Sequence, residues 1–182
     1  MTFLSPRSLL VVGGARSGKS GWAQRLADSS PRAPWLIATA EAGDDEMAAR
    51  IARHAAERDA RWRLVEAPLD LGGALAATCA EDRIVVVDCV TFWLANLMLA
   101  GRDAEGAIAA LTDALPALAG PVIFVSNEVG LGIVPDNRLA RDFRDAQGRA
   151  NQALAQACDA VVEVTAGLPR RIKPAPAPDI RF

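Results

Sequence analysis

The chain has 182 residues, 51% of them hydrophobic, and a formal net charge of -2. This length suits one domain that buries a full core, and a second independent domain is not expected. The charge balance lacks the overall basic excess that draws proteins to nucleic acid. We therefore predict no nucleic-acid partner.

Three cysteines, Cys79, Cys89 and Cys158, are scattered and lack the close C-x-x-C spacing of metal sites and redox pairs. They are interpreted as reduced, mostly buried, intracellular thiols. The N-terminal run MTFLSPRSLLVVGG has no long apolar core followed by a small-residue cleavage site. A cytoplasmic protein is predicted.

The most apolar stretch, residues 84–100, is almost long enough to span a bilayer, but it contains Asp88 and Asn96. A buried strand followed by a core helix explains the same residues without placing a carboxylate in lipid. We predict no insertion into a membrane.

Short β-branched apolar runs recur along the chain, each followed by a turn signal and a helical pattern, which predicts parallel strands joined by crossover helices. The expected strands are 9–12, 35–39, 62–66, 84–88, 122–126 and 161–164. The third run alternates apolar and polar residues, whereas the others are apolar nearly throughout. Because strands covered on both faces read as continuous apolar runs, the third is expected at an edge of the sheet.

The expected helices are 19–28, 44–58, 69–80, 92–100, 104–118 and 138–157. The final run, LPRRIKPAPAPDIRF, alternates Pro with Ala and is expected to form neither a helix nor a central strand. A disordered tail and an extended arm on a neighbour both fit it. We predict one catalytic domain over residues 1–173 and a Pro-rich tail over residues 174–182.

A phosphate-binding motif, G-x-x-x-x-G-K-[ST], lies between the first expected strand and the first expected helix. Its residues are Gly13, Gly14, Ala15, Arg16, Ser17, Gly18, Lys19 and Ser20. The glycines let backbone N–H groups surround phosphate oxygens, and the start of the helix adds positive potential. Lys19 supplies a point charge, and Ser20 can ligate Mg²⁺. The motif in this context predicts a P-loop NTPase-type three-layer α/β sandwich with a mostly parallel central sheet flanked by helices.

P-loop proteins need a second anchor for the metal, usually an acid at the end of a neighbouring apolar strand. Asp88 follows Ile-Val-Val-Val and fits that place, although a helix-capping or strand-end aspartate is the alternative. The chain contains neither the N-K-x-D segment of switch GTPases nor the S-G-G-Q signature of transporter ATPases. Both subclasses are therefore disfavoured.

The only histidine, His54, lies in the expected helix 44–58, whose first turn holds three acids favoured by the helix dipole. Met47 and Arg50 lie on the same side of that helix as His54. Spacing alone favours a surface or boundary histidine over a catalytic one.

Five motifs occur in order: G-G-A-R-S-G-K-S, D-D-E-M-A-A-R-I-x-x-H, W-R-x-x-E, V-D-C-V-T and N-E-V-G-x-G-I-V-P-x-N-R-x-x-R-x-F-R-D. Together they resemble the bifunctional adenosylcobinamide kinase / adenosylcobinamide-phosphate guanylyltransferase family of cobalamin synthesis, from about residue 9 to residue 173. The resemblance implies that ATP or GTP phosphorylates adenosylcobinamide, and that GTP then donates GMP to the new phosphate. It also implies a homotrimer.

The resemblance implies that His54 carries GMP covalently, a role suited to a neutral imidazole. Lys19 is the other residue expected to take part in catalysis. Further nucleotide contacts implied by the resemblance are Ile37, Ala38, Thr39, Arg58, Glu66 and Asp88. Mg²⁺ is the expected cofactor, held by Ser20 and Asp88, with ATP and GTP as substrates.

The segment 127–135 follows a buried strand and should reach the carboxyl edge of the sheet, where ligands bind in open parallel sheets. An ordinary loop fits it on spacing alone, whereas the resemblance favours a corrinoid site or a mobile flap. Arg138, Arg141 and Arg144 recur every three residues and could face phosphates or water. Two other functions remain open: a P-loop kinase without guanylyl transfer, and a non-catalytic nucleotide-dependent regulatory module.

Overall fold

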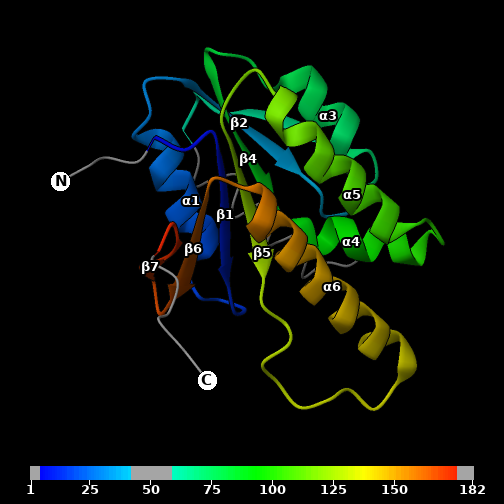
Figure 1. Cartoon of the computed structure of the whole chain (residues 1–182). Helices are drawn as coiled ribbons and strands as arrows, with labels where there is room; N and C mark the ends of the chain where they lie inside the picture. Colours follow the sequence, from blue (N-terminus) through cyan, green and yellow to red (C-terminus); the bar gives the residue numbers. More distant parts are fainter. Residues whose placement is uncertain (1–4, 42–58, 176–182) are drawn as a thin grey trace, which may run out of the picture.

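The computed structural model describes residues 5–41 and 59–175 (Figure 1). The strands are β1 (Ser8–Gly13), β2 (Ala33–Ala38), β3 (Arg63–Glu66), β4 (Arg83–Asp88), β5 (Val122–Asn127), β6 (Ala160–Thr165) and β7 (Leu168–Lys173). The helices are α1 (Lys19–Asp28), α3 (Leu71–Thr78), α4 (Val90–Leu99), α5 (Ala104–Ala114) and α6 (Arg138–Ala157), with a 3₁₀ turn η1 (Leu115–Ala117). The expected helix 44–58 lies outside the described residues.

The strands form one seven-stranded sheet in the order β3-β2-β4-β5-β1-β6-β7. All neighbouring pairs are parallel except β6 and β7, which are antiparallel. The exposed strand β3 lies at one edge of the sheet, as its alternating sequence predicted. The mostly parallel sheet predicted from the apolar runs is therefore confirmed.

Helices cover both faces of this sheet, so that the fold has three layers (Figure 1). α1 packs on one face, over a core cluster that includes Ala23 and Val11. α3, α4, α5 and α6 pack on the other, over a cluster that includes Phe124 and Leu10. Successive strand residues point to opposite faces, and each central strand is apolar throughout because both of its faces are buried. The P-loop three-layer prediction is confirmed.

Several helix ends differ from the predicted ones for local reasons. α3 begins at Leu71 because the carboxylate of Asp70 caps it, accepting a hydrogen bond from Gly73 N at 2.9 Å. The predicted helix 104–118 ends at Ala114 and continues as a single 3₁₀ turn that contains Pro116. A proline in a helix interior removes a hydrogen-bond donor, which explains this early end.

The C-terminal run was expected to be a disordered tail or an extended arm on a neighbour, and both alternatives were wrong for residues 168–173. These residues form β7, an edge strand of the protein's own sheet, joined to β6 by a tight turn at Ala166 and Gly167. Both turn residues have positive φ, 52° and 80°, as two-residue hairpin turns require. Pro169 is tolerated because β7 has a free edge.

Lys173, the last residue of β7, connects this strand to the end of α6. Its Nζ donates hydrogen bonds to the carbonyl oxygens of Ala155, Gln156 and Cys158, at 3.0, 2.8 and 2.6 Å. The last carbonyls of a helix have no partner within the helix, and a cation there also interacts favourably with the helix dipole. This capping gives the edge strand a defined place against α6.

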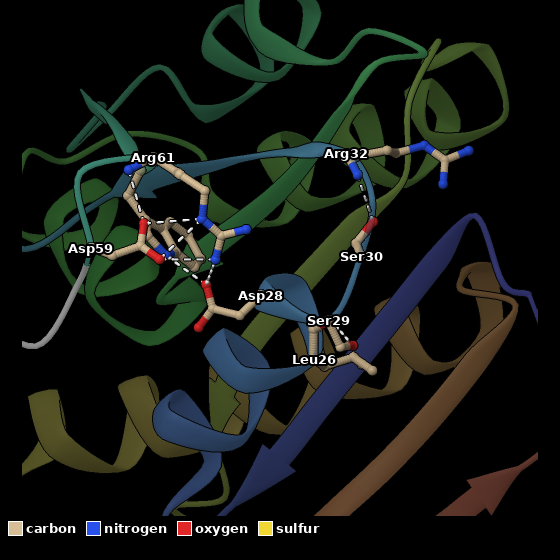
Figure 2. Close-up of polar contacts among 8 residues, drawn as sticks. Leu26, Asp28, Ser29, Ser30, Arg32, Asp59 and Arg61 are labelled. Atoms are coloured by element: carbon tan, nitrogen blue, oxygen red, sulfur yellow. Dashed lines mark hydrogen bonds and ion pairs between the residues drawn. The ribbon is translucent and has the colours of Figure 1, made fainter.

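A charged cluster holds the start of β3 against the end of α1 (Figure 2). Arg61 pairs with Asp59 at 2.8 Å and with Asp28 at 3.5 Å, and Trp62 Nε1 donates to Asp28 Oδ1 at 2.9 Å. The hydrogen bond from Arg61 lowers the pKa of the Asp59 carboxyl and raises that of the guanidinium. Exposed ion pairs stabilise little, so the cluster orients the chain as it enters the sheet.

The apolar run 84–100 forms β4 and α4, as predicted. Within residues 5–41 and 59–175, no helix combines the length and the apolarity that crossing a bilayer requires.

All three cysteines are buried free thiols. Burial raises the pKa of Cys79 and of Cys89 to about 11, and that of Cys158 to about 12.

Since an unfolded thiol has a pKa of about 8.5, the native protein should resist alkylation near that pH, and denaturant should expose three reactive thiols. Unfolded thiols lose their protons first, so the free energy of unfolding should fall as pH rises above about 8.5. Rapid alkylation of the folded protein would contradict this burial.

Candidate active site at the carboxyl edge of the sheet

The phosphate-binding motif forms a tight loop between β1 and α1. β1 ends at Gly13, Ser17 N donates to Gly14 O at 3.2 Å, and α1 begins at Lys19. Gly18 has φ 91°, a left-handed conformation that favours glycine. The structure therefore gives the motif the strand–loop–helix setting that phosphate binding requires.

Gly13 has no room for a side chain. A Cβ built there would lie 2.4 Å from the carbonyl oxygen of Val164 and 2.7 Å from Ser17 Oγ. The loop is also braced by the β6–β7 turn, since Gly167 N donates to Ser17 O at 2.8 Å. The path of the loop is therefore fixed by β6, which neighbours β1 on the side away from β5, and by the turn that follows β6.

Gly13→Ala is expected to destabilise the protein by about 1–3 kcal/mol, because the new methyl group clashes with backbone. Gly148→Ala is a suitable control, since a Cβ there meets nothing within 4 Å. It lies inside α6, where alanine is favoured over glycine by about 1 kcal/mol. In thermal unfolding, the Tm of Gly13→Ala should lie below that of the wild type, and the Tm of Gly148→Ala should lie above it. A Gly13→Ala protein with wild-type stability and nucleotide affinity would contradict the close packing at this position.

Lys19 and Ser20 form the first turn of α1. Lys19 is 6% exposed, and its Nζ donates to Gly14 O at 3.1 Å, which holds the ammonium group over the loop. Ser20 is half-buried. Backbone N–H groups at a helix N-terminus and a lysine ammonium together make a strong site for phosphate.

Asp88 ends β4, two strands from β1, and is half-buried. Ile84 and Val86 of the same strand pack in the cluster under α1, so period-two alternation places Asp88 on that face too. The helix-capping alternative does not hold for α4, whose N-cap residue is Cys89. Asp88 and the P-loop therefore share one edge and one face of the sheet.

The donor set suits magnesium. Mg²⁺ prefers oxygen ligands and is usually held by one or two protein groups together with phosphate and water. The hydroxyl of Ser20 and the carboxylate of Asp88 meet this description, and both lie on the α1 side of the sheet edge. No group of three or more His, Cys, Asp or Glu residues that could hold a metal occurs in the described part of the chain.

The strand end 37–39 offers mostly backbone to a ligand. Ile37 is fully buried in the cluster under α3–α6, on the face opposite the P-loop helix. Thr39 is also fully buried, and its hydroxyl donates to Cys89 O at 2.6 Å and accepts from Cys89 N at 2.9 Å. Ala38 is half-buried next to Asp88, and exposed Glu66 ends the neighbouring strand β3.

His54 and Arg58 lie outside the described residues, so their predicted roles stay predictions. The remaining predicted site residues lie in the P-loop or at the carboxyl ends of β2, β3 and β4.

The three recurring arginines have partners close to them. Arg141 Nη1 donates to the carbonyls of Pro135 and Asp136, at 3.0 and 2.8 Å, which holds the end of the β5–α6 loop. Arg138 and Arg144 form ion pairs with acids of their own helix, at 3.4 and 3.1 Å. In this structure the arginines support the loop and the first turns of α6.

Sequence reasoning missed the bracing turn at Gly167. It placed the segment 127–135 at this edge of the sheet, but it did not show that Asn127 lies beside the P-loop. Asn127 is the last residue of β5, and its Cα lies opposite that of Gly13 in the parallel register. The signal available in the sequence was a polar residue directly after a buried strand. The sequence did not show which strand lies beside β1.

Residues 9–172 match the model of the cobinamide kinase / cobinamide phosphate guanyltransferase family. The chain belongs to this family. It is 47% identical over 169 residues to the bifunctional adenosylcobalamin biosynthesis protein CobP of Pseudomonas aeruginosa, covering 92% of this chain and 98% of that protein. It is 41% identical over 180 residues to the corresponding CobU of Salmonella typhimurium, covering 91% and 99%.

Solved structures with the same fold include two distant P-loop proteins. An ATPase of a type III secretion system aligns with a TM-score of 0.55 and 13% identity, over 87% of this chain and 51% of that one. The RadB recombinase aligns with a TM-score of 0.53 and 17% identity, over 87% and 74%. At such identity the likeness concerns the fold alone.

Proposed function

We propose that this protein is a bifunctional transferase of cobalamin biosynthesis. It phosphorylates the aminopropanol hydroxyl of adenosylcobinamide with ATP or GTP, and then transfers GMP from GTP to that phosphate to give adenosylcobinamide-GDP. The carrying observation is a family match over residues 9–172 that includes an intact P-loop at the carboxyl edge of the sheet. We further propose that the protein works in the cytoplasm as a homotrimer.

The P-loop would hold the triphosphate of either nucleotide. Backbone N–H groups of residues 13–20 would surround the phosphate oxygens, and Lys19 would neutralise the charge that develops during transfer. The burial of Lys19 supports this role, because a charge in a water-poor site acts more strongly on its ligand. Contacts to the nucleoside would come from Glu66, Arg58 and the backbone of residues 37–39.

Ser20 and Asp88 would hold Mg²⁺ on the nucleotide. When bound, the ion neutralises phosphate oxygens and favours departure of the leaving group. Asp88 is suited to this task because it ends β4 and its side chain belongs to the face of the sheet that carries α1.

His54 would act as the nucleophile of the second reaction. A neutral imidazole nitrogen attacks the α-phosphorus of GTP, the bond to the bridging oxygen breaks, and pyrophosphate leaves. The phosphate of adenosylcobinamide phosphate then attacks the same phosphorus, which breaks the N–P bond and returns the histidine. The imidazole must be unprotonated for the first step, so labelling by GTP should weaken in acid.

Incubation with adenosylcobinamide, MgATP and MgGTP tests this function. The expected products are adenosylcobinamide phosphate and then adenosylcobinamide-GDP, resolved by chromatography of the corrinoids. Phosphorylation without GDP formation would leave a kinase alone. A protein that binds nucleotide but leaves the corrinoid unphosphorylated would contradict the proposal and favour a regulatory module.

A further inference from the structure

Asn127 lies at the centre of the phosphate edge. β5 runs between β4, which ends in Asp88, and β1, which ends in Gly13. In the register of these strands, Asn127 lies opposite Gly13, and Val125 lies opposite Asp88. A metal–phosphate group that spans the P-loop and Asp88 must therefore pass over the end of β5.

The side chain of Asn127 belongs to the face that carries α1. Ile123 and Val125 of β5 pack in the cluster under α1, and alternation assigns Asn127 to the same face. Ser126 belongs to the opposite face and is fully buried there against α6. Asn127 thus shares its face with Lys19 and Asp88.

The backbone of Asn127 is fixed by side chains from two helices. Its N–H donates to Thr91 Oγ1 at 2.8 Å, and its carbonyl accepts from Asn151 Nδ2 at 3.0 Å. The next residue, Glu128, donates its N–H to Gly13 O at 3.0 Å. These bonds lock Asn127 in position relative to the P-loop before any ligand arrives.

A buried polar network supports this position from the α6 side. Ser126 Oγ donates to Asn151 Oδ1 at 2.6 Å, while Gln147 Nε2 donates to Ser126 Oγ and to Asn151 Oδ1, at 2.9 and 3.0 Å. Because these hydrogen bonds hold Ser126, Gln147 and Asn151 in one arrangement, the network makes the end of β5 rigid.

The side-chain oxygen of Asn127 is buried and has no hydrogen-bond partner among the described residues, as is also true of Ser17 Oγ in the P-loop and Gln147 Oε1 in the network. A buried acceptor without a partner is unfavourable, so a bound group that donates a hydrogen bond to Oδ1 gains affinity. Phosphate oxygens only accept, so the amide group that would face them is Nδ2–H. A carboxamide offers both a donor and an acceptor and carries no charge that would repel phosphate.

We propose that Asn127 is a catalytic residue whose side-chain amide hydrogen-bonds to the terminal phosphate of the bound triphosphate. This inference rests on the proposed kinase reaction. There, the corrinoid hydroxyl oxygen forms a bond to the γ-phosphorus, and the bond from that phosphorus to the bridging oxygen breaks. The nucleoside diphosphate leaves, and the hydroxyl proton passes to solvent. Asn127 donates to an oxygen of the transferred group and stabilises its charge during the transfer.

Binding of ADP and of a non-hydrolysable ATP analogue separates this contact from a merely structural role. In Asn127→Ala, the Kd of the triphosphate analogue should rise roughly tenfold, the loss expected for one hydrogen bond to a charged group. The Kd of ADP, which lacks the terminal phosphate, should stay within about twofold of wild type. The kcat of corrinoid phosphorylation should fall about 100-fold, with little change in the KM for the corrinoid.

Asn127→Asp keeps the shape of the side chain and serves if the alanine variant does not fold. Its carboxylate repels phosphate, so its triphosphate affinity should fall at least as far, again with ADP affinity retained. Gln152→Ala, which removes an exposed amide of α6, should leave both affinities unchanged. Equal weakening of ADP and the triphosphate analogue, or wild-type kcat, would overturn the assignment. A wild-type protein that binds the analogue but does not phosphorylate the corrinoid would instead refute the proposed function.

Discussion

His54→Ala is expected to abolish transfer of GMP while leaving phosphorylation of adenosylcobinamide close to the wild-type rate. Loss of a nucleophile removes the covalent route itself, so guanylyl transfer should fall by at least about 1,000-fold. The kinase step needs no attack by imidazole, because the corrinoid hydroxyl is the nucleophile there. The two reactions of one protein sample therefore act as controls for each other.

The covalent intermediate gives this prediction a direct readout. Wild-type protein incubated with α-labelled GTP should retain label that is labile in acid and stable in alkali, as a phosphoramidate is. The His54→Ala protein should retain none. Label of that stability on the His54→Ala protein would show that another residue carries GMP, and equal loss of both activities would indicate a structural role for His54.

Lys19→Ala is expected to lower both activities by about 100- to 1,000-fold, because one phosphate cradle would serve both nucleotides. Nζ of Lys19 already lies over the loop, bonded to Gly14 O at 3.1 Å. Its removal takes away the one ammonium group in the motif and leaves the backbone donors and the guanidinium of Arg16. Steady-state assays of the kinase reaction and of guanylyl transfer, each with saturating corrinoid, would measure the loss of kcat in both.

Arg25→Ala is the matched control for Lys19→Ala. Arg25 is an exposed cation in the last turn of the same helix, more than one helical turn beyond the motif. Its loss should change neither activity by more than about twofold, since exposed charges far from a site act weakly through solvent. Intact kinase turnover in Lys19→Ala beside lost guanylyl transfer would defeat the shared cradle.

The phosphate site could be predicted from sequence because its parts are local. Glycines, lysine and serine occur within eight consecutive residues, and the flanking apolar run and helical pattern supply the geometry of the loop. Asp88 was predictable for a similar reason, since an acid after a continuous apolar run must lie at a strand end. Edge placement of β3 also followed from its own alternating residues.

The missed features depend on contacts between distant parts of the chain. β7 was not predicted because the Pro-rich composition around Pro169 hid a six-residue edge strand that is held by Lys173 and α6. The place of Asn127 depends on the order of strands, which apolar runs do not reveal. The contacts that the resemblance implies for Ile37 and Thr39 stay predictions; because both side chains pack within the protein, the backbone would make these contacts.

Competition between MgATP and MgGTP tests the central claim that a single phosphate cradle serves both reactions. Titration calorimetry should show one binding site per chain for each nucleotide, and protein saturated with the ATP analogue should release it when GTP is added. Simultaneous binding of both nucleotides to the same chain would contradict the shared cradle. Absence of heat from either triphosphate in the presence of magnesium would contradict the site itself.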